Sequence, residues 1–409
     1  MSKWRALLLT TLSVVSIFAY NNCSNKGFDI SESLVTIASN ASGPLTIVGN
    51  EANVMKLTIS CNYINQPCVS VTICEPGTSN CQTIDKILID TGSFGLRVFS
   101  SLVSVNLTQR TINGGNLTEC VRYADNSSNW GPIKTADVVL GSLKASSIPI
   151  QIIDASYATV PTECGTPDSS PTAAGYNGIL GVGIFTEDCG IGCANTTNNR
   201  VYYACSGSTC GYTAVPVAQQ VSNPISFLPS DNNGVIFQLP SIPSAGSTTA
   251  SGYVILGIGT RSNNTPTSAN VFKADGNGYF KTTFNGTTLV QSFIDSGSNG
   301  LFFPGPANLP SCSSGSGASG FYCPTTTTTY TAYQSGSGSN TQVAVSFEIQ
   351  NAAYAVTTSP NFMFNNIGGS AGDMTSSYDW GLPFYFGRTI FHGIDGKSSP
   401  LGTGPYWAW

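Results

Sequence analysis

Charged side chains and histidine are scarce in this sequence of 409 residues. Charged residues make up 9% of the chain, the net charge is −5, and the isoelectric point is near 4.8. This acidic balance argues against nucleic acid as a partner, because phosphate binding needs a basic face. The single histidine, His392, would have to serve any Ser-His-Asp triad, and within "TIFHGID" it is better interpreted as a strand residue. No metal site is expected, since the cysteine spacings do not repeat as a four-ligand set.

Long hydrophobic runs are missing after the N-terminal region. Residues 1–22 combine two basic side chains with an apolar run, Ala6–Ala19, that is short for a membrane span and is typical of a bacterial signal peptide. Residues 23–50 are rich in Ser, Asn and Gly, and we expect them to form a flexible leader. The sequence therefore predicts an exported protein, located in the bacterial cell envelope (as a periplasmic protein or an outer-membrane lipoprotein) or secreted.

Cysteine, in contrast, is plentiful, with 13 in the chain. Exported proteins usually oxidise their cysteines in pairs, so an odd number leaves one apart. Cys23 stands where bacterial lipoproteins carry their lipid, although Tyr20-Asn21-Asn22 before it are not the small residues that this processing prefers. Lipidation of Cys23 and cleavage near Ala19 both stay open, and contact with a membrane is expected only through such an anchor. Short spacings suggest four of the remaining bridges, namely Cys74–Cys81, Cys189–Cys193, Cys205–Cys210 and Cys312–Cys323.

Helical periodicity is also scarce, whereas Gly, Ser, Thr and Asn are abundant. This composition predicts an all-β protein with many turns. Residues 135–154 have the pattern of a hairpin, and residues 342–356 that of two further strands. A short helix is expected only around residues 214–223.

An internal repeat organises the chain. The segment "ILIDTGSFGL", with Asp90, and the segment "SFIDSGSNGL", with Asp295, agree at Ile, Asp, Gly, Ser, Gly and Leu in register. Each copy follows an apolar strand and precedes a glycine motif at a similar distance along the chain. Gene duplication into two related lobes, residues 51–250 and 251–409, would give this order.

The two repeated turns point to paired carboxylates. Glycine after the aspartate allows a tight turn that directs N–H groups at the carboxylate, and the following serine can donate to its outer oxygen. A single Asp-Thr-Gly-Ser is an ordinary turn signal, but two copies in the same context favour catalysis. Two carboxylates in contact share one proton, so one can activate water while the other polarises a carbonyl group. The residues expected to support Asp90 and Asp295 are Thr91, Gly92, Ser93, Ser296, Gly297 and Ser298.

These motifs resemble those of the pepsin-like aspartic proteases, a family with two β-rich lobes. Each lobe of that family also carries a hydrophobic-hydrophobic-Gly motif, which Ile179-Leu180-Gly181 matches closely and Trp380-Gly381 matches less well. The resemblance implies an all-β, pepsin-like bilobal fold and an aspartic endopeptidase with Asp90 and Asp295 as its dyad. It further implies a monomer without metal or organic cofactor that takes a peptide or protein substrate in the cleft between the lobes.

The resemblance also suggests residues around the substrate. Residues 120–141 stand where the family's flap hairpin should lie, so Tyr123 resembles the flap tyrosine and Trp130 is a second candidate. A plain strand aromatic is the alternative for Tyr123. The family usually has a tryptophan partnering this tyrosine, and here Arg97 takes its place. Arg97 could form a structural ion pair or could select an acidic or C-terminal carboxylate on the substrate.

Two rival interpretations stay open. The chain is also similar to an uncharacterised bacterial family of probable lipoproteins, which supplies no demonstrated activity. A non-catalytic envelope lipoprotein could use the same cleft to bind peptide or glycan; Arg97 and the unusual second glycine motif favour this alternative, and the retained acid pair disfavours it. The other rival interpretation is a glycosidase, in which the distance between the two carboxyl groups would be greater than contact distance.

Overall fold

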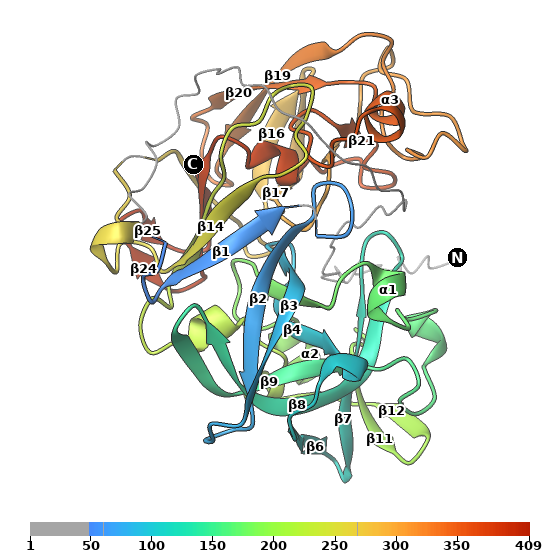
Figure 1. The fold of residues 1–409 in the computed structure, drawn as a ribbon, viewed down its shortest axis with the longest axis vertical. Coiled ribbons are helices and arrows are strands. Elements are labelled where there is room, and N and C mark those ends of the chain that lie inside the picture. Colours follow the sequence, from blue (N-terminus) through green and yellow to red (C-terminus); the bar gives the residue numbers. More distant parts are fainter. Residues whose placement is uncertain (1–48, 60, 268) are drawn as a thin grey trace, which may run out of the picture.

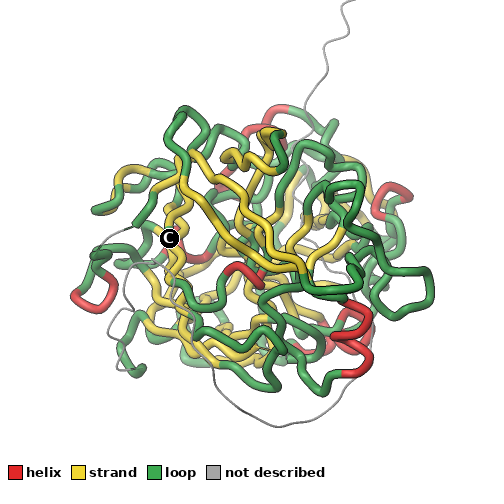
Figure 2. The backbone as a smooth tube through the Cα atoms, turned by 90° about the horizontal axis from the view of Figure 1, so that it is seen from above, coloured by secondary structure: helices red, strands yellow, loops and turns green. Residues whose placement is uncertain are grey.

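The computed structural model describes residues 49–59, 61–267 and 269–409. The predicted signal peptide, nearly all of the predicted leader and the lipidation candidate Cys23 lie outside the described residues. Strands form most of the regular secondary structure, and the helices are short (Figure 2). Figure 1 shows strands β2 to β9 in the lower part of the molecule and β16 to β21 in the upper part, with β1 and β14 between them. The prediction of an all-β, bilobal protein with two barrel-like sheets is confirmed.

The larger sheet contains strands from both ends of the described chain. Its strands are β1 (Val54–Ile59), β2 (Pro67–Cys74), β3 (Cys81–Asp90), β4 (Phe94–Phe99), β5 (Thr108–Gln109), β6 (Thr111–Ile112), β7 (Gly115–Arg122), β8 (Ser128–Leu140), β9 (Leu143–Ile153), β10 (Gly178–Val182), β11 (Tyr202–Ser206), β12 (Thr209–Tyr212), β13 (Gly234–Gln238), β14 (Ser251–Leu256), β15 (Val271–Lys273), β23 (Thr389–Gly393) and β26 (Tyr406–Ala408). Because β23 pairs with β13, and β26 with both β23 and β15, this sheet joins the two halves of the chain. The histidine His392 lies in β23, as its sequence context predicted.

The second sheet belongs to the second half of the chain alone. Its strands are β16 (Phe280–Phe284), β17 (Thr287–Ile294), β18 (Leu301–Phe302), β19 (Thr328–Ser335), β20 (Val343–Ile349), β21 (Gly368–Gly369) and β22 (Asp379–Trp380). A small ribbon is formed by β24 (Ser398–Ser399) and β25 (Gly402–Thr403). The helices of the described residues are α1 (Pro171–Ala174), α2 (Ile191–Asn195) and α3 (Ala352–Thr358), with 3-10 turns at Ser100–Leu102, Thr162–Cys164, Val217–Gln219, Pro224–Phe227, Ser262–Asn264 and Leu382–Phe384.

The sequence repeat is also a repeat of strand pairing. In the first half, β10 runs parallel to β3 and antiparallel to β4, which sets Gly181 opposite Asp90. In the second half, β22 runs parallel to β17 and antiparallel to β18. Both motif glycines are required by space, since a Cβ atom would lie 2.5 Å from the Phe94 nitrogen at Gly181 and 2.1 Å from the Gly300 oxygen at Gly381. The glycine motifs therefore hold the strands that carry the two aspartates.

Six disulfides connect the described cysteines. The four predicted bridges are confirmed, and the other two are Cys61–Cys68 and Cys120–Cys164. Six bridges are typical of a protein that folds in an oxidising compartment, as expected of an extracellular or secreted chain. Among the described residues, no helix has the length and apolar character needed to cross a membrane.

Two secondary-structure predictions are wrong in detail. Residues 342–356 were expected to form two strands, but after β20 the chain turns into helix α3. The side chain of Asn351 caps this helix by accepting a hydrogen bond of 2.9 Å from the Tyr354 nitrogen, and such capping outweighs the alternating pattern. The helix expected at 214–223 is reduced to the 3-10 turn Val217–Gln219.

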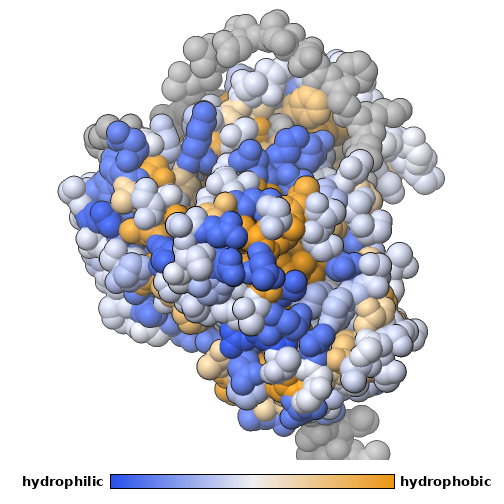
Figure 3. All heavy atoms as spheres, turned by 60° about the horizontal axis from the view of Figure 1, so that its bottom comes forward, coloured by the Kyte–Doolittle hydropathy of each residue, from blue (hydrophilic) through white to orange (hydrophobic). Residues whose placement is uncertain are grey.

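The surface reflects the low charge of the sequence. Figure 3 views the molecule from the lower side of Figure 1, and hydrophilic side chains there alternate with residues of intermediate hydropathy. Hydrophobic side chains gather near the centre of the same face. Solvation of this protein therefore depends mainly on uncharged polar groups.

Candidate active site

The two repeated aspartates meet inside the protein. Asp90 is the last residue of β3, and Asp295 directly follows β17. Both are 0% exposed, and their side chains lie within hydrogen-bonding reach of each other. Burial, and then the neighbouring charges of Asp90 and Asp379, raise the pKa of Asp295 well above its usual range. The site therefore favours a state in which the two acids share one proton.

Each carboxyl group sits in a small cradle made by its own turn. The Gly92 nitrogen donates to Oδ1 of Asp90 at 2.8 Å, and the Ser93 hydroxyl donates to Oδ2. The second turn repeats this arrangement, with distances of 2.8 Å for both donors, Gly297 N to Oδ1 and Ser298 Oγ to Oδ2 of Asp295. Matched donors on both acids fix the direction of each carboxyl plane.

The two turns are locked to each other by reciprocal hydrogen bonds. The Thr91 nitrogen donates to Ser296 Oγ at 3.1 Å, and the Ser296 nitrogen donates to Thr91 Oγ1 at 2.9 Å. The two hydroxyls also donate across to backbone carbonyls, Thr91 to Ile294 and Ser296 to Ile89, at 3.0 and 2.8 Å. These bonds hold the two halves of the chain in one register at the acids.

Glycine is needed where each turn touches the opposite acid. A Cβ atom on Gly92 would lie 2.7 Å from Oδ2 of Asp295, and one on Gly297 would lie 2.6 Å from Oδ1 of Asp90. Real Cβ atoms do not approach oxygen so closely, so any larger residue would push the carboxyl groups apart. The glycines therefore serve the approach of the two acids as well as the turns.

A third acid, Asp379, lies beside the pair and was missed by the sequence analysis. It occupies the position before Trp380-Gly381 where the first motif has Ile179. An acid at this hydrophobic position of the motif was the feature of the sequence that could have indicated it. Asp379 is 0% exposed, and neither carboxyl oxygen has a hydrogen-bond partner among the described residues. Burial raises its pKa well above the usual range; the nearby Ser298 hydroxyl lowers it in part, and the charge of Asp90 adds to the rise. Burial therefore favours the protonated form of Asp379. In the described part of the chain, no group of three or more His, Cys, Asp or Glu side chains is placed to hold a metal ion.

Replacing Asp379 with asparagine is expected to stabilise the protein at neutral pH and to change little in acid. Because folding raises the pKa of this carboxyl, its favourable contribution is complete below the unfolded pKa of about 4 and is lost as pH rises through the folded pKa. Each pH unit between the two pKa values corresponds to about 1.4 kcal/mol. Asparagine has nearly the same shape and no proton to lose, so this loss is removed.

Urea unfolding at about pH 3.5 and about pH 7 measures this effect. Asp373→Asn is the matched control, because Asp373 is exposed and belongs to the same segment of the chain. A wild type and an Asp379→Asn variant of equal stability at both pH values would show that Asp379 does not titrate in the folded protein.

A buried tyrosine extends the site on the inner side of Thr91. The Tyr385 hydroxyl lies 2.9 Å from Thr91 Oγ1 and 3.2 Å from Nε2 of His392. Burial lowers the pKa of His392 to about 3, so this imidazole is neutral across the physiological range. Tyr385 was also not predicted from the sequence, because no local pattern indicates its contact with Thr91.

The predicted flap tyrosine is packed rather than open. Tyr123 follows β7 at the tip of the β7–β8 hairpin, where its nitrogen donates to the Ser127 carbonyl at 2.9 Å. Its ring is buried in a cluster with Tyr176 and Ile179, and its hydroxyl donates to Asn129 Oδ1 at 2.8 Å. The hairpin tip is thus fixed against the first glycine motif.

Trp130 does not face a cleft, so its predicted place over the substrate is wrong. It is 0% exposed and packs edge-on against Tyr203, with ring centres 5.2 Å apart. The indole nitrogen donates to the Tyr157 carbonyl at 2.6 Å, and the same cluster contains cysteines of two disulfides. Trp130 is therefore a core residue.

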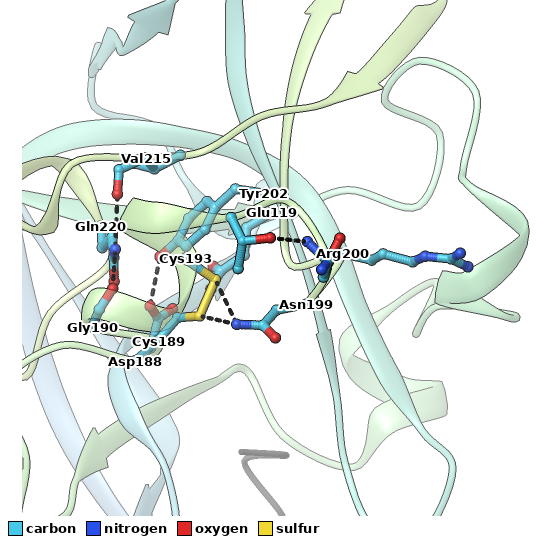
Figure 4. Close-up of a disulfide and its surroundings, with 12 residues drawn as sticks. Glu119, Asp188, Cys189, Gly190, Cys193, Asn199, Arg200, Tyr202, Val215 and Gln220 are labelled. Carbon is cyan, nitrogen blue, oxygen red and sulfur yellow. Dashed lines mark hydrogen bonds between the residues drawn. A yellow bond between two sulfur atoms is a disulfide. The ribbon is translucent and has the colours of Figure 1, made fainter. Parts of the chain in front are cut away.

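Arg97, for which the sequence left a structural ion pair and a substrate contact open, belongs to a buried ion cluster. Its Nη2 atom lies 3.0 Å from both Glu119 Oε1 and Asp188 Oδ2, and all three side chains are enclosed. The Tyr202 hydroxyl donates to the other oxygen of Asp188 at 2.6 Å, next to the Cys189–Cys193 disulfide (Figure 4). Burial alone would lower the pKa of Arg97, but the charge of Glu119 and its neighbours raises it overall. The alternative prediction, a structural ion pair, describes what the structure contains.

A disulfide-closed loop crosses between the two halves beside the second turn. In the loop between Cys61 and Cys68, the Asn65 amide donates to the carbonyls of Asn299 and Phe364 at 2.8 and 2.9 Å. On the other side, Gln66 Nε2 donates to the Gly175 carbonyl at 3.0 Å. The acids are enclosed in this arrangement, so a substrate can reach them only if the surrounding loops move.

Three comparisons place the chain among known proteins. It matches the sequence model of the family described as "Protein of unknown function (DUF3443)" over residues 49–409. It has no match among curated proteins. Among solved structures, it is similar to "Crystal structure of aspartic proteinase from Irpex lacteus", with a TM-score of 0.49 and 15% identity, over 87% of this chain and 96% of that chain.

Proposed function

Since this chain belongs to the DUF3443 family of proteins of unknown function, we propose its activity from its geometry: an aspartic endopeptidase that is exported to the cell envelope or secreted. The observation that carries the proposal is the pair formed by Asp90 and Asp295. The two carboxyl groups lie side by side, have matched hydrogen-bond donors, and share a site in which burial and the charge of Asp90 favour the protonated form of Asp295. An ordinary turn or a structural ion pair would not need two acids with the same set of hydrogen-bond donors.

The proposed reaction uses both protonation states of the pair. Asp295, whose pKa is raised, holds the shared proton and donates it toward the oxygen of the scissile carbonyl. Asp90 takes a proton from a water molecule, whose oxygen then bonds to the carbonyl carbon. When the tetrahedral intermediate collapses, the carbon–nitrogen bond breaks, Asp90 passes the proton taken from water to the leaving amine, and a hydroxyl of the intermediate returns its proton to Asp295 as the new carbonyl group forms. One water is consumed, and the pair returns to its starting state.

Cleavage of a quenched-fluorescence peptide library between about pH 3 and pH 7, with and without pepstatin, tests this proposal. We expect cleavage with an optimum on the acid side, because activity is lost once the pair gives up its shared proton. Pepstatin is expected to inhibit it. A library left intact across the whole pH range would contradict the proposal.

A non-catalytic function is the second candidate, and one observation favours it. Asp90 and Asp295 have no exposed surface, and the loop between Cys61 and Cys68 ties both halves together beside them. A protein of this kind would bind peptide or glycan in the cleft without hydrolysing it. Mass spectrometry of peptides recovered after binding distinguishes the two functions, since intact peptide supports the binding protein and fragments support the peptidase.

We also propose export, which the six disulfides support. Lipidation at Cys23 stays a prediction from the sequence. The mass of the mature N-terminal peptide, isolated from membranes and from the medium, decides between a lipidated Cys23 and cleavage near Ala19.

A further inference from the structure

A cavity of about 740 Å³ is walled mainly by the second half of the chain, and its wall residue Trp380 accepts a backbone hydrogen bond from Asp295 at 3.1 Å. Its walls come from segments 241–244, 343–348 and 386–388, and from the rings of Trp380 and Trp409. Neither Asp90 nor Asp295 contributes to these walls. The volume is within the range of sites that hold small organic ligands.

Arg388 is the cation of this cavity, and its charge is not balanced by an acid. The ion pairs of the described residues involve other basic side chains, those of Arg97, Lys144, Arg200 and Arg261. The guanidinium of Arg388 donates one hydrogen bond, from Nη1 to the Phe384 carbonyl at 2.7 Å, and its Nε is buried without a partner. Burial lowers the pKa of Arg388 to about 10, so the group is still charged at neutral pH. Arg388 is partly buried, and removing such a cation from water is costly unless an anion accompanies it.

Aromatic rings shape the wall around this cation. The guanidinium lies over the Phe384 ring at 4.3 Å from its centre and 5.7 Å from the centre of the Trp409 ring. These rings offset part of the charge and hold the guanidinium plane flat, which leaves its edge for a carboxylate. Asn365, also on the wall, has an Oδ1 atom that is buried without a hydrogen-bond partner.

We propose that this cavity binds the carboxy terminus of a peptide that ends in an apolar residue. The terminal carboxylate pairs with Arg388 through two parallel hydrogen bonds, the terminal N–H group donates to Asn365, and the last side chain packs on Trp380 and Trp409. Glu348 lines the same cavity, and the ion pairs of the described residues include neither Glu348 nor Arg388. A second negative charge would face Glu348, so the site selects a single carboxylate over a dianion such as sulfate.

Calorimetric titration of the full chain with N-acetyl-L-phenylalanine tests the site, and the neutral N-acetyl-L-phenylalaninamide is the matched probe. We expect the carboxylate to bind at least about tenfold more tightly than the amide, because the charged pair forms only with the former. Sodium sulfate at the same ionic strength is expected not to displace it. Equal affinity for both probes, no binding of the acid, or displacement by sulfate would each overturn the proposal.

Variants separate this cavity from the dyad and from the rest of the surface. Arg388→Met is expected to abolish the preference for the carboxylate, while Arg200→Met, which removes an arginine that is paired with Glu163 at the surface, is expected to retain it. Asp90→Asn is expected to bind like the wild type, since Asp90 is not on the wall. Retention of the preference in Arg388→Met would overturn the assignment to Arg388. The comparison of the two probes on the wild type tests the proposal even if Arg388→Met does not fold.

Discussion

Replacement of Asp90 by asparagine is expected to abolish peptide cleavage and to leave the fold intact. Asparagine still offers Oδ1 to the Gly92 nitrogen, so the turn keeps its main hydrogen bond. It cannot accept a proton from water, and the shared proton of the pair has no second carboxyl group. Removing a general base of this kind typically lowers kcat by roughly 100- to 10,000-fold. Single-turnover cleavage of a library peptide measures the loss, and thermal unfolding shows that the protein is folded.

A neighbouring carboxyl group on the same strand provides the control. Asp85 lies on β3 five positions before Asp90, is exposed, and accepts a hydrogen bond from Ser70. Asp85→Asn is expected to cleave at the rate of the wild type. If Asp90→Asn kept that rate as well, any cleavage by this protein would have to arise elsewhere. Asp295→Asn is expected to match Asp90→Asn, since neither acid works without the other.

The parts of the site that could be predicted from the sequence are those set by local turn chemistry. A strand followed by Asp-Thr/Ser-Gly-Ser specifies its own cradle, because the donors to Asp90 come from Gly92 and Ser93, two and three positions further along. The repeat of that turn at Asp295 then implied a pseudo-twofold meeting of two acids. Four short disulfides were predicted from spacing, but Cys61–Cys68, which has the same separation of 7 as Cys74–Cys81, was missed, and Cys120–Cys164 spans 44 positions and gave no local signal.

The parts that could not be predicted depend on contacts between distant segments. Asp379 reaches the pair only because β22 runs parallel to β17, and no periodic pattern in the sequence predicts this strand pairing. Tyr385 meets Thr91 across 294 positions. The choice between two roles for Arg97 also required the fold, since its partner Asp188 is 91 positions away. Burial then decided that choice, because an enclosed guanidinium between two acids has no surface left for a substrate.

Replacing Arg97 with methionine is expected to destabilise the protein by about 3–5 kcal/mol at neutral pH, because it leaves buried acids without their cation. Methionine fills similar space, so the loss reflects charge more than packing. Burial and then the charge of Glu119 raise the pKa of Asp188 well above its usual range, so Asp188 already resists ionisation while the cation is present. Without the guanidinium, the two acids face each other in the core with no cation to balance them. The destabilisation should shrink as pH falls, because protonation of Asp188 removes negative charge from the cluster.

Urea unfolding of Arg97→Met at neutral and acid pH measures this effect, and two further variants give it specificity. Arg200→Met removes an arginine that is paired at the surface and is expected to leave the unfolding free energy nearly unchanged. Arg97→Met combined with Glu119→Gln removes the charge together with its partner, and should recover most of the lost stability at neutral pH. A double variant no more stable than Arg97→Met would show that the arginine acts through packing. Recovery would show that Arg97 acts through its charge, as the cation of a buried ion cluster beneath the hairpin.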